Sequence, residues 1–185
     1  ASLLLALGVS PAAASASVHT AEIFASGVSG ISHLRFGNVD RGLFKRLLIP
    51  GFVGGIVGAY ILTALPGEKM KPWVALYLLV MGVMILRKAL GRITRAGPRP
   101  SLVPLGLPVG FFDAIGGGGW GPIVTSTLVA RGNPPRFTVG SVNATEFFIT
   151  LSQSITFVLA LGSDYLQYWQ IILGLLIGGA LAAPL

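Results

Sequence analysis

The sequence GGGGWGP, at residues 116–122, interrupts the apolar pattern of the chain between the runs 102–112 and 123–130. Each glycine costs a helix about 0.8–1.0 kcal/mol relative to alanine, and a proline in a helix interior costs about 3 kcal/mol. An unbroken helix through this stretch is therefore disfavoured. At membrane depth, such irregular backbone is tolerated where it is buried in protein or lines a watery cavity. The stretch predicts a broken helix that forms a binding site.

The composition is that of a membrane protein. Hydrophobic residues make up 53% of the chain and charged residues 10%, and the mean hydropathy is +0.80, outside the usual balance of soluble domains. A helix needs about 17–25 mostly apolar residues to cross the hydrocarbon core. The segments that meet this length, or run to the end of the sequence, are 12–34, 47–65, 72–90, 137–161 and 170–185. We expect an all-α polytopic membrane protein.

An internal repeat relates the two halves of the chain at a constant offset of 124 residues. The offset aligns Pro11 with Pro135 and Glu22 with Glu146, which are scarce residue types here, so a shared apolar composition does not explain the match. It divides one membrane domain into a first repeat, 1–97, and a second, 98–185. The first copy lacks its glycine-rich hairpin and the second lacks its last span. We therefore expect the natural protein to be longer at both ends.

The basic residues predict the topology. Eleven of the thirteen lysines and arginines lie in the loops 35–46, 87–99 and 131–136. These loops reach the same side if the segment 102–130 folds back at its glycines as a re-entrant hairpin, and the positive-inside rule makes that side cytoplasmic. Each repeat then has a glycine-broken hairpin and three spans. Because three is odd, the two repeats have inverted topology, as in many secondary transporters.

Several motifs resemble those of a known family. The second half has Gly-Phe-Phe-Asp at 110–113 before GGGGWGP, then Arg131-Gly132, a proline pair, and a Gly-Ser-x-Asn-x-x-Glu run ending at Glu146. The first half has Leu-Gly-Val-x-Pro at 7–11, Ser-Val-His at 17–19, Glu22, and Gly-Asn-Val-Asp at 37–40. Together these patterns resemble the signatures of the sulfite exporter TauE/SafE family of anion permeases, over nearly the whole chain.

This resemblance implies a secondary transporter in the bacterial inner membrane. It would export a small anion, sulfite or a sulfur-containing organic anion, by alternating access. A carrier for another small solute is one alternative, and a non-transporting membrane subunit that binds a partner is another. The expected surroundings are substrate and lipid, with a homodimer left open and no nucleic acid, because the positive charge is explained by topology.

The glycine stretch supplies the first set of candidate substrate-binding residues. A helix N-terminus carries about half a positive charge and unpaired N–H groups, so a helix that restarts after the stretch would direct donors at an oxyanion. Glycine also permits close approach of backbone to ligand. The alternative is that the glycines only pack a tight helix crossing. The candidates are Gly116, Gly117, Gly118, Gly119, Trp120 and Thr125.

Glu22 and Glu146 are candidates for proton coupling. A carboxylate within a span costs about 2.5 kcal/mol or more and usually faces the protein interior. A polar residue stands three positions before each glutamate, on the same helical face, and a serine precedes each of these, which completes two clusters that would flank the substrate. The alternative is that each glutamate, neutral and hydrogen-bonded, ties its helix to the broken one. The preceding residues are Ser17 and His19 in the first copy, and Ser141 and Asn143 in the second.

Other residues carry weaker signals. We expect His33 at the membrane edge. Asp113 is expected to cap or hold the hairpin, or to touch the site. Arg131 and Arg136 are expected either to set the topology or to attract anions. Gln153 and Ser152 join helices by hydrogen bonds. No strand precedes the glycines, so a dinucleotide site is not expected, and two distant histidines without cysteine do not predict a zinc site. We expect no cofactor, no metal and no enzymatic activity.

Overall fold

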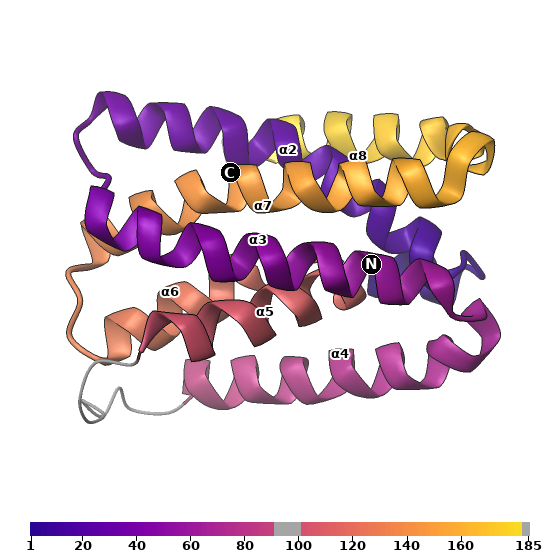
Figure 1. Ribbon diagram of the computed structural model, residues 1–185, viewed down its shortest axis with the longest axis horizontal. Helices are drawn as coiled ribbons and strands as arrows, with labels where there is room; N and C mark the ends of the chain where they lie inside the picture. Colours follow the sequence, from indigo (N-terminus) through magenta and orange to yellow (C-terminus); the bar gives the residue numbers. More distant parts are fainter. Residues whose placement is uncertain (91–100, 183–185) are drawn as a thin grey trace.

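The computed structural model describes residues 1–90 and 101–182, which fold as helices joined by short turns (Figure 1). The described residues contain no strand, as the all-α prediction requires. In chain order the elements are α1 (Ser2–Ala6), α2 (Pro11–Arg35), α3 (Arg41–Ala64), α4 (Gly67–Leu90), α5 (Leu102–Gly116), α6 (Trp120–Ala130), α7 (Pro135–Leu161), the 3-10 helix η1 (Gly162–Tyr168) and α8 (Trp169–Ala182).

Side-chain caps decide where two of the long helices begin. The hydroxyl of Ser10 accepts the N–H of Ala13 at the start of α2. The carboxylate of Asp40 accepts the N–H groups of Gly42 and Leu43, at 2.7 and 3.0 Å, so α3 begins at Arg41 rather than at the predicted 47. Because an N-cap satisfies otherwise unpaired helix donors, the basic segment 41–46 is helical and not a loop.

The other predicted spans correspond to observed helices. The segments 12–34, 137–161 and 170–185 match α2, α7 and α8, and residues 183–185 lie outside the described part. Helix α4 starts at Gly67, so the predicted polar turn 66–71 is largely its first turns. Among described residues, three stretches are long and apolar enough to span a membrane: Arg41–Ala64, Gly67–Arg87 and Pro135–Ala180. Helix α2 is as long but less apolar, because polar side chains line its buried face.

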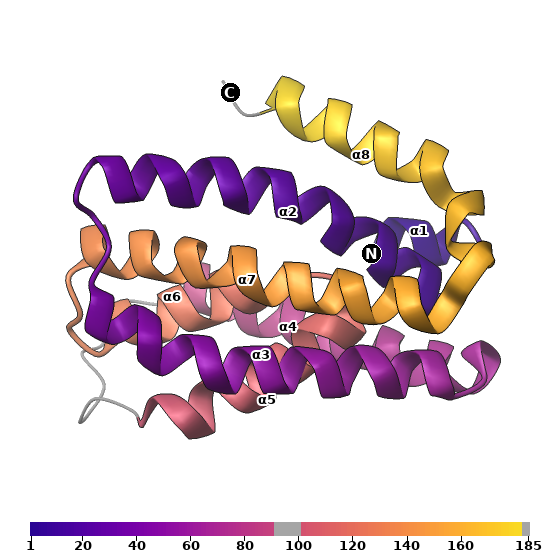
Figure 2. The same ribbon diagram turned by 45° about the horizontal axis from the view of Figure 1, so that its top comes forward.

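The predicted break in the helix is confirmed. Helices α5 and α6 are 15 and 11 residues long and are separated by the glycines. In Figures 1 and 2 both lie at the same end of the bundle, and the turn between them lies near its middle. The hairpin of α5 and α6 therefore begins and ends at the same end of the bundle, which is also where α2 meets α3 and α6 meets α7.

Glycines let α5 pack directly against α3. A Cβ atom added at Gly54 would overlap the carbonyl oxygen of Leu107, and one at Gly58 would overlap that of Phe111. The same face of α3 meets α7, where a Cβ at Gly55 would lie 2.9 Å from the amide nitrogen of Gln153. The hairpin is thus held in place by backbone-to-backbone contact, which only glycine permits.

The bounds of the helices recur at the repeat offset. Helices α1 and α6 end at Ala6 and Ala130, and α2 and α7 begin at Pro11 and Pro135. Helices α2 and α7 pack against each other and run in opposite directions (Figure 1). This arrangement agrees with an inverted repeat, which stays a prediction for the protein as a whole.

Candidate functional site

The glycine turn at 116–119 forms the centre of the candidate site. Gly116 ends α5, and Gly117 and Gly118 have φ angles of +65° and +115°, which side chains other than glycine rarely adopt. The N–H groups of Gly117 and Gly118 both donate to the carbonyl oxygen of Asp113, at 2.9 and 3.3 Å. Gly119 then caps α6. The turn is therefore closed by its own backbone and by the last turn of α5.

Asp113 connects the two halves of the broken helix. Its carboxylate accepts the N–H of Trp120 at 2.8 Å through Oδ1, and Gln153 Nε2 of α7 at 3.0 Å through Oδ2. The side chain is 1% exposed. Of the roles left open in the sequence, the structure places Asp113 as the cap of α6. The prediction that Gln153 joins helices is confirmed.

His19 and Glu22 of α2 face the turn from the other side. His19 Nδ1 lies 2.9 Å from Glu22 Oε2, and His19 Nε2 lies 3.2 Å from the carbonyl oxygen of Asp113. The imidazole is completely buried and stacks on Phe157, with 6.2 Å between ring centroids. Glu22 is half-buried, and its Oε1 lies 3.2 Å from the position of a Cβ on Gly118. This pair is in direct contact with the glycine turn.

Glu146 of α7 reaches the start of α6. Its carboxylate lies beside Gly121, where an added Cβ would lie 3.3 Å from Oε1 and 3.5 Å from Oε2. Carboxylates thus lie at both of the first two residues of α6: Asp113 accepts the N–H of Trp120, and Glu146 lies against Gly121. Helix N-termini favour anions, and here the protein's own carboxylates lie where an anion would bind. Four polar residues were predicted to flank the site together with the glutamates. Of these four, only His19 makes a hydrogen bond to the hairpin.

The other three lie elsewhere. Ser17 donates to the carbonyl of Ala13 in its own helix. Ser141 accepts the N–H of Asp40 at 2.8 Å, at the end of the bundle where α2 and α3 meet. Asn143 donates to Ser29 and so joins α7 to α2. Ser141 and Asn143 thus link α7 to other parts of the bundle, and substrate contact by the three residues stays a prediction.

On α6, the two candidates beyond the glycines differ in surroundings. The indole of Trp120 is completely buried against Gly51 and Ile149, and its Nε1 has no hydrogen-bond partner among the described residues. Thr125 is half-buried, five residues further along the helix. Trp120 therefore presents a packed side chain to the core, and its backbone N–H, not its ring, borders the turn.

Two residues of the site were not found by sequence reasoning. Ser15 donates its hydroxyl to the carbonyl oxygen of Ala114, next to Asp113. Tyr77 of α4 packs its ring on Gly116 and on Phe112, with 5.2 Å between ring centroids. The Tyr77 hydroxyl is buried without a partner among the described residues, 3.2 Å from a Cβ position on Gly119.

The remaining candidates lie away from the turn. His33 Nδ1 and Arg136 both bond the side chain of Asn38, and Arg136 also donates to the carbonyl of Phe36 at 3.2 Å, so both residues fasten the ends of α2 and α7 together. Arg131 follows the end of α6. The prediction that Ser152 joins helices is wrong, because its hydroxyl donates to Ile149 in its own helix.

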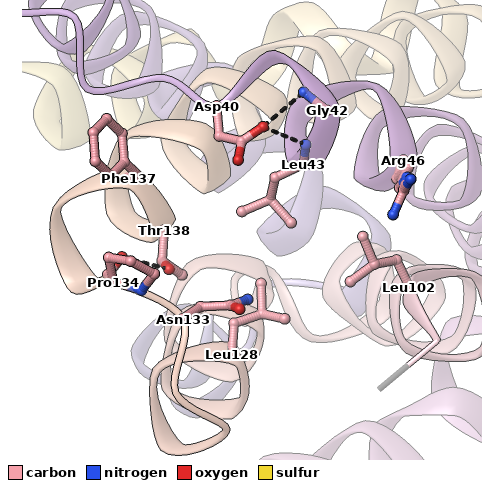
Figure 3. A pocket seen from close by; sticks show the side chains of 10 residues that line it. All are labelled: Asp40, Gly42, Leu43, Arg46, Leu102, Leu128, Asn133, Pro134, Phe137 and Thr138. Carbon is pink, nitrogen blue, oxygen red and sulfur yellow. Dashed lines mark hydrogen bonds between the residues drawn. The ribbon is translucent and has the colours of Figure 1, made fainter. Parts of the chain in front are cut away.

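A cavity of about 430 Å³ opens at the end of the bundle where α3 and α7 begin (Figure 3). Arg46 of α3, Asn133 and Asp40 give it polar walls. An apolar cluster fills the bundle between this cavity and the glycine turn, because Trp120, Val124 and Leu128 follow each other along α6 from the turn to the cavity wall. The lining residues are Asp40, Gly42, Leu43, Arg46, Leu102, Leu128, Asn133, Pro134, Phe137 and Thr138.

Metal ligands do not gather in the described part of the chain: within residues 1–90 and 101–182, no group of three or more histidine, aspartate and glutamate side chains is placed to hold an ion. The groups that the site brings together are the backbone N–H groups of the turn and the titratable side chains of His19, Glu22, Asp113 and Glu146.

Comparison with known proteins identifies the family. The model of the sulfite exporter TauE/SafE family matches residues 1–185. The chain is 43% identical, over 192 residues, to a Bacillus subtilis (strain 168) protein named "Probable membrane transporter protein YtnM". That alignment covers all of this chain and 64% of the relative, so the chain spans less than two thirds of that protein. No solved structure matches. The motifs, the broken helix and this match show that the chain belongs to the sulfite exporter TauE/SafE family of membrane proteins.

Proposed function

We propose that this protein exports a small anion, sulfite or an organosulfonate, across the cytoplasmic membrane by alternating access. The family description and the name of the relative support a transporter. The recurrence of helix ends at the offset of 124 supports two inverted repeats that rock around a central site. The basic residues of 35–46 and 131–136 lie at one end of the bundle, which the positive-inside rule makes the cytoplasmic end, and residues 91–99 of the third basic loop lie outside the described part.

One observation carries the choice of an anion as substrate: carboxylate oxygens already lie at the start of α6. Asp113 accepts the N–H of Trp120 at 2.8 Å, and Glu146 places its carboxylate beside Gly121, with Oε1 3.3 Å from the position of a Cβ on that residue. A sulfite or sulfonate group presents similar oxygens with similar charge, so it can take the place of Glu146 while Asp113, which is fully buried, continues to hold the hairpin. The aligned peptide dipoles of α6 stabilise either anion.

Coupling of transport to protons follows from this replacement of Glu146 by the substrate anion. Glu146 or Glu22 must lose its negative charge, or move, before a substrate anion can lie beside it, because like charges in a poorly solvated site repel strongly. Both glutamates touch the glycines or the start of α6. In this proposal, protonation of one glutamate accompanies binding of the anion, and its release accompanies the release of the anion.

Anion-dependent thermal stabilisation of the purified protein tests the proposal. We expect sulfite or methanesulfonate to raise the unfolding temperature of the wild-type protein. Gly118→Val should abolish that rise, because its side chain would project toward Glu22. Gly132→Val is the matched control: Gly132 also has a positive φ, +89°, but nothing lies within 4 Å of its Cβ position. The control should be destabilised by strain and should still respond to the anion.

Two results would point to the alternatives. Stabilisation by an uncharged solute, and not by any anion, would favour a carrier for another substrate. No response to any solute, with a wild-type protein that is folded by circular dichroism, would favour a membrane subunit that does not transport.

A further inference from the structure

The hydrogen bonds of His19 determine how many protons it shares with Glu22. The Nε2 atom faces the carbonyl oxygen of Asp113 at 3.2 Å, and a carbonyl can only accept, so Nε2 carries a proton. The Nδ1 atom faces Glu22 Oε2 at 2.9 Å, a distance that requires a proton between them. That proton makes the pair an imidazolium with a carboxylate or an imidazole with a carboxylic acid. Either form is neutral overall.

Loss of the shared proton would be costly in this environment. The pair would then carry one negative charge, and two lone pairs would face each other at the Nδ1–Oε2 contact. The ionisable groups near it on other elements are two more carboxylates, Asp113 of α5 and Glu146 of α7. A further negative charge beside carboxylates is disfavoured.

The remaining titratable groups around the pair do not offset the negative charge of these acidic side chains. They are the hydroxyl of Tyr77 on α4 and the hydroxyl of Tyr165 in η1, which bonds Thr20. On α8, the residues facing Glu22 are apolar or glycine. The charge balance of the site therefore depends on whether the His19–Glu22 proton is present.

The pair is connected to the turn and is partly exposed on its Glu22 side. The carbonyl oxygen of Asp113 that accepts His19 Nε2–H also accepts the N–H groups of Gly117 and Gly118. The side chain of Glu22 is 30% exposed and lines a largely apolar groove of about 630 Å³ between α2 and α8, which diverge in Figure 2. His19 is completely buried, so Glu22 is the more exposed member of the pair.

We propose that His19 and Glu22 form a single proton-binding site whose proton binds together with the substrate anion at the glycine turn. This inference rests on the proposed function, and it assigns the coupling proton to this pair and not to Glu146. Because binding linkage is reciprocal, a proton that favours the anion is itself held more firmly when the anion is bound. The two then move as a neutral unit, one proton with one monovalent anion.

Calorimetric titration with methanesulfonate tests the proposal, since this probe stays fully ionised between about pH 5 and 9. The wild-type protein, reconstituted in nanodiscs, is titrated in buffers of different ionisation enthalpy. We expect its affinity to fall as pH rises, approaching about tenfold per pH unit, with close to one proton taken up per anion at the alkaline end.

Glu22→Gln is the decisive variant. Its amide can donate to Nδ1 of a neutral His19, which reproduces the proton-loaded pair at every pH. It should bind methanesulfonate at alkaline pH as tightly as the wild-type protein binds at acidic pH, without proton uptake. The matched controls are Glu68→Gln, at an exposed residue paired with Lys71, and His33→Gln, at the far end of α2. Both should keep the wild-type pH dependence.

The possible failures are distinguishable. Wild-type binding that does not vary with pH, or a Glu22→Gln protein that keeps the wild-type pH dependence, would overturn this inference and leave the proposed function in place. Weaker binding by folded Glu22→Gln at every pH would also overturn it. Absence of methanesulfonate binding by the wild-type protein at every pH would overturn the proposed function, and this inference with it.

Discussion

The carboxylate of Asp113 accepts the backbone N–H of Trp120 at 2.8 Å, so a side chain near the end of α5 caps the first residue of α6 across the glycine turn. N-caps usually come from the residue just before a helix. Here Gly119 occupies that position and has no side chain to offer. The broken helix is therefore held by a residue from its own preceding half, and this contact defines the shape of the candidate site.

Replacing Asp113 with alanine should lower the free energy of unfolding by about 3 kcal/mol, because it leaves the buried N–H of Trp120 and the amide of Gln153 without acceptors. Asp113→Asn should cost about 1 kcal/mol, since its carbonyl still caps α6. Denaturant unfolding in detergent measures both. Equal losses for the two variants would show that the charge of Asp113, not its capping oxygen, stabilises the hairpin.

Glycines of α3 and α4 should differ sharply in their tolerance of a methyl group. Gly54→Ala should destabilise by more than about 2 kcal/mol, because its Cβ overlaps the backbone of α5 at Leu107. Gly82→Ala should stabilise by up to about 1 kcal/mol, because its Cβ meets nothing within 4 Å and alanine favours helix. Thermal unfolding of the two variants checks the difference. A tolerated Gly54→Ala would contradict the close contact of α3 with α5.

Trp120 should contribute through packing. We expect Trp120→Phe to cost about 1–2 kcal/mol, because it fills much of the same space and removes a buried N–H that has no partner among the described residues. Trp120→Ala should cost about 3–5 kcal/mol. Anion affinity, measured by titration, should be the same for Trp120→Phe and wild type. A large loss of affinity in a stable Trp120→Phe protein would instead place the indole in contact with the substrate.

Glu146 should compete with the substrate. Its carboxylate lies beside Gly121 at the start of α6, so Glu146→Gln, which removes the charge, should raise anion affinity by about tenfold, equivalent to about 1.4 kcal/mol. The pH dependence of binding should remain, because the His19–Glu22 pair is intact. Titration over a range of pH tests both statements, with Glu68→Gln as the control. Loss of the pH dependence in Glu146→Gln would assign the coupling proton to Glu146.

The sequence by itself was sufficient for the helical fold, the break at residues 116–119 and the partly buried placement of Glu22. These features follow from local chemistry. Glycine and proline set the energy of the backbone within a few residues, apolar length sets the spans, and a carboxylate in an apolar helix has few stable positions outside the interior. The starts of α3 and α4 were misplaced, because Asp40 and the segment 66–71 extend helices into polar sequence.

Only the tertiary structure decided which side chains meet the turn. His19 bonds Asp113 across 94 residues, and Ser15 bonds Ala114 across 99. Ser141 and Asn143, which the repeat places opposite Ser17 and His19, join helices instead. The physical reason is that periodicity assigns a residue to a helix face, whereas the rotation and depth of that helix are set by packing. Here the packing is governed by the glycine contacts between α3 and α5, which carry the turn to His19, Glu22 and Glu146.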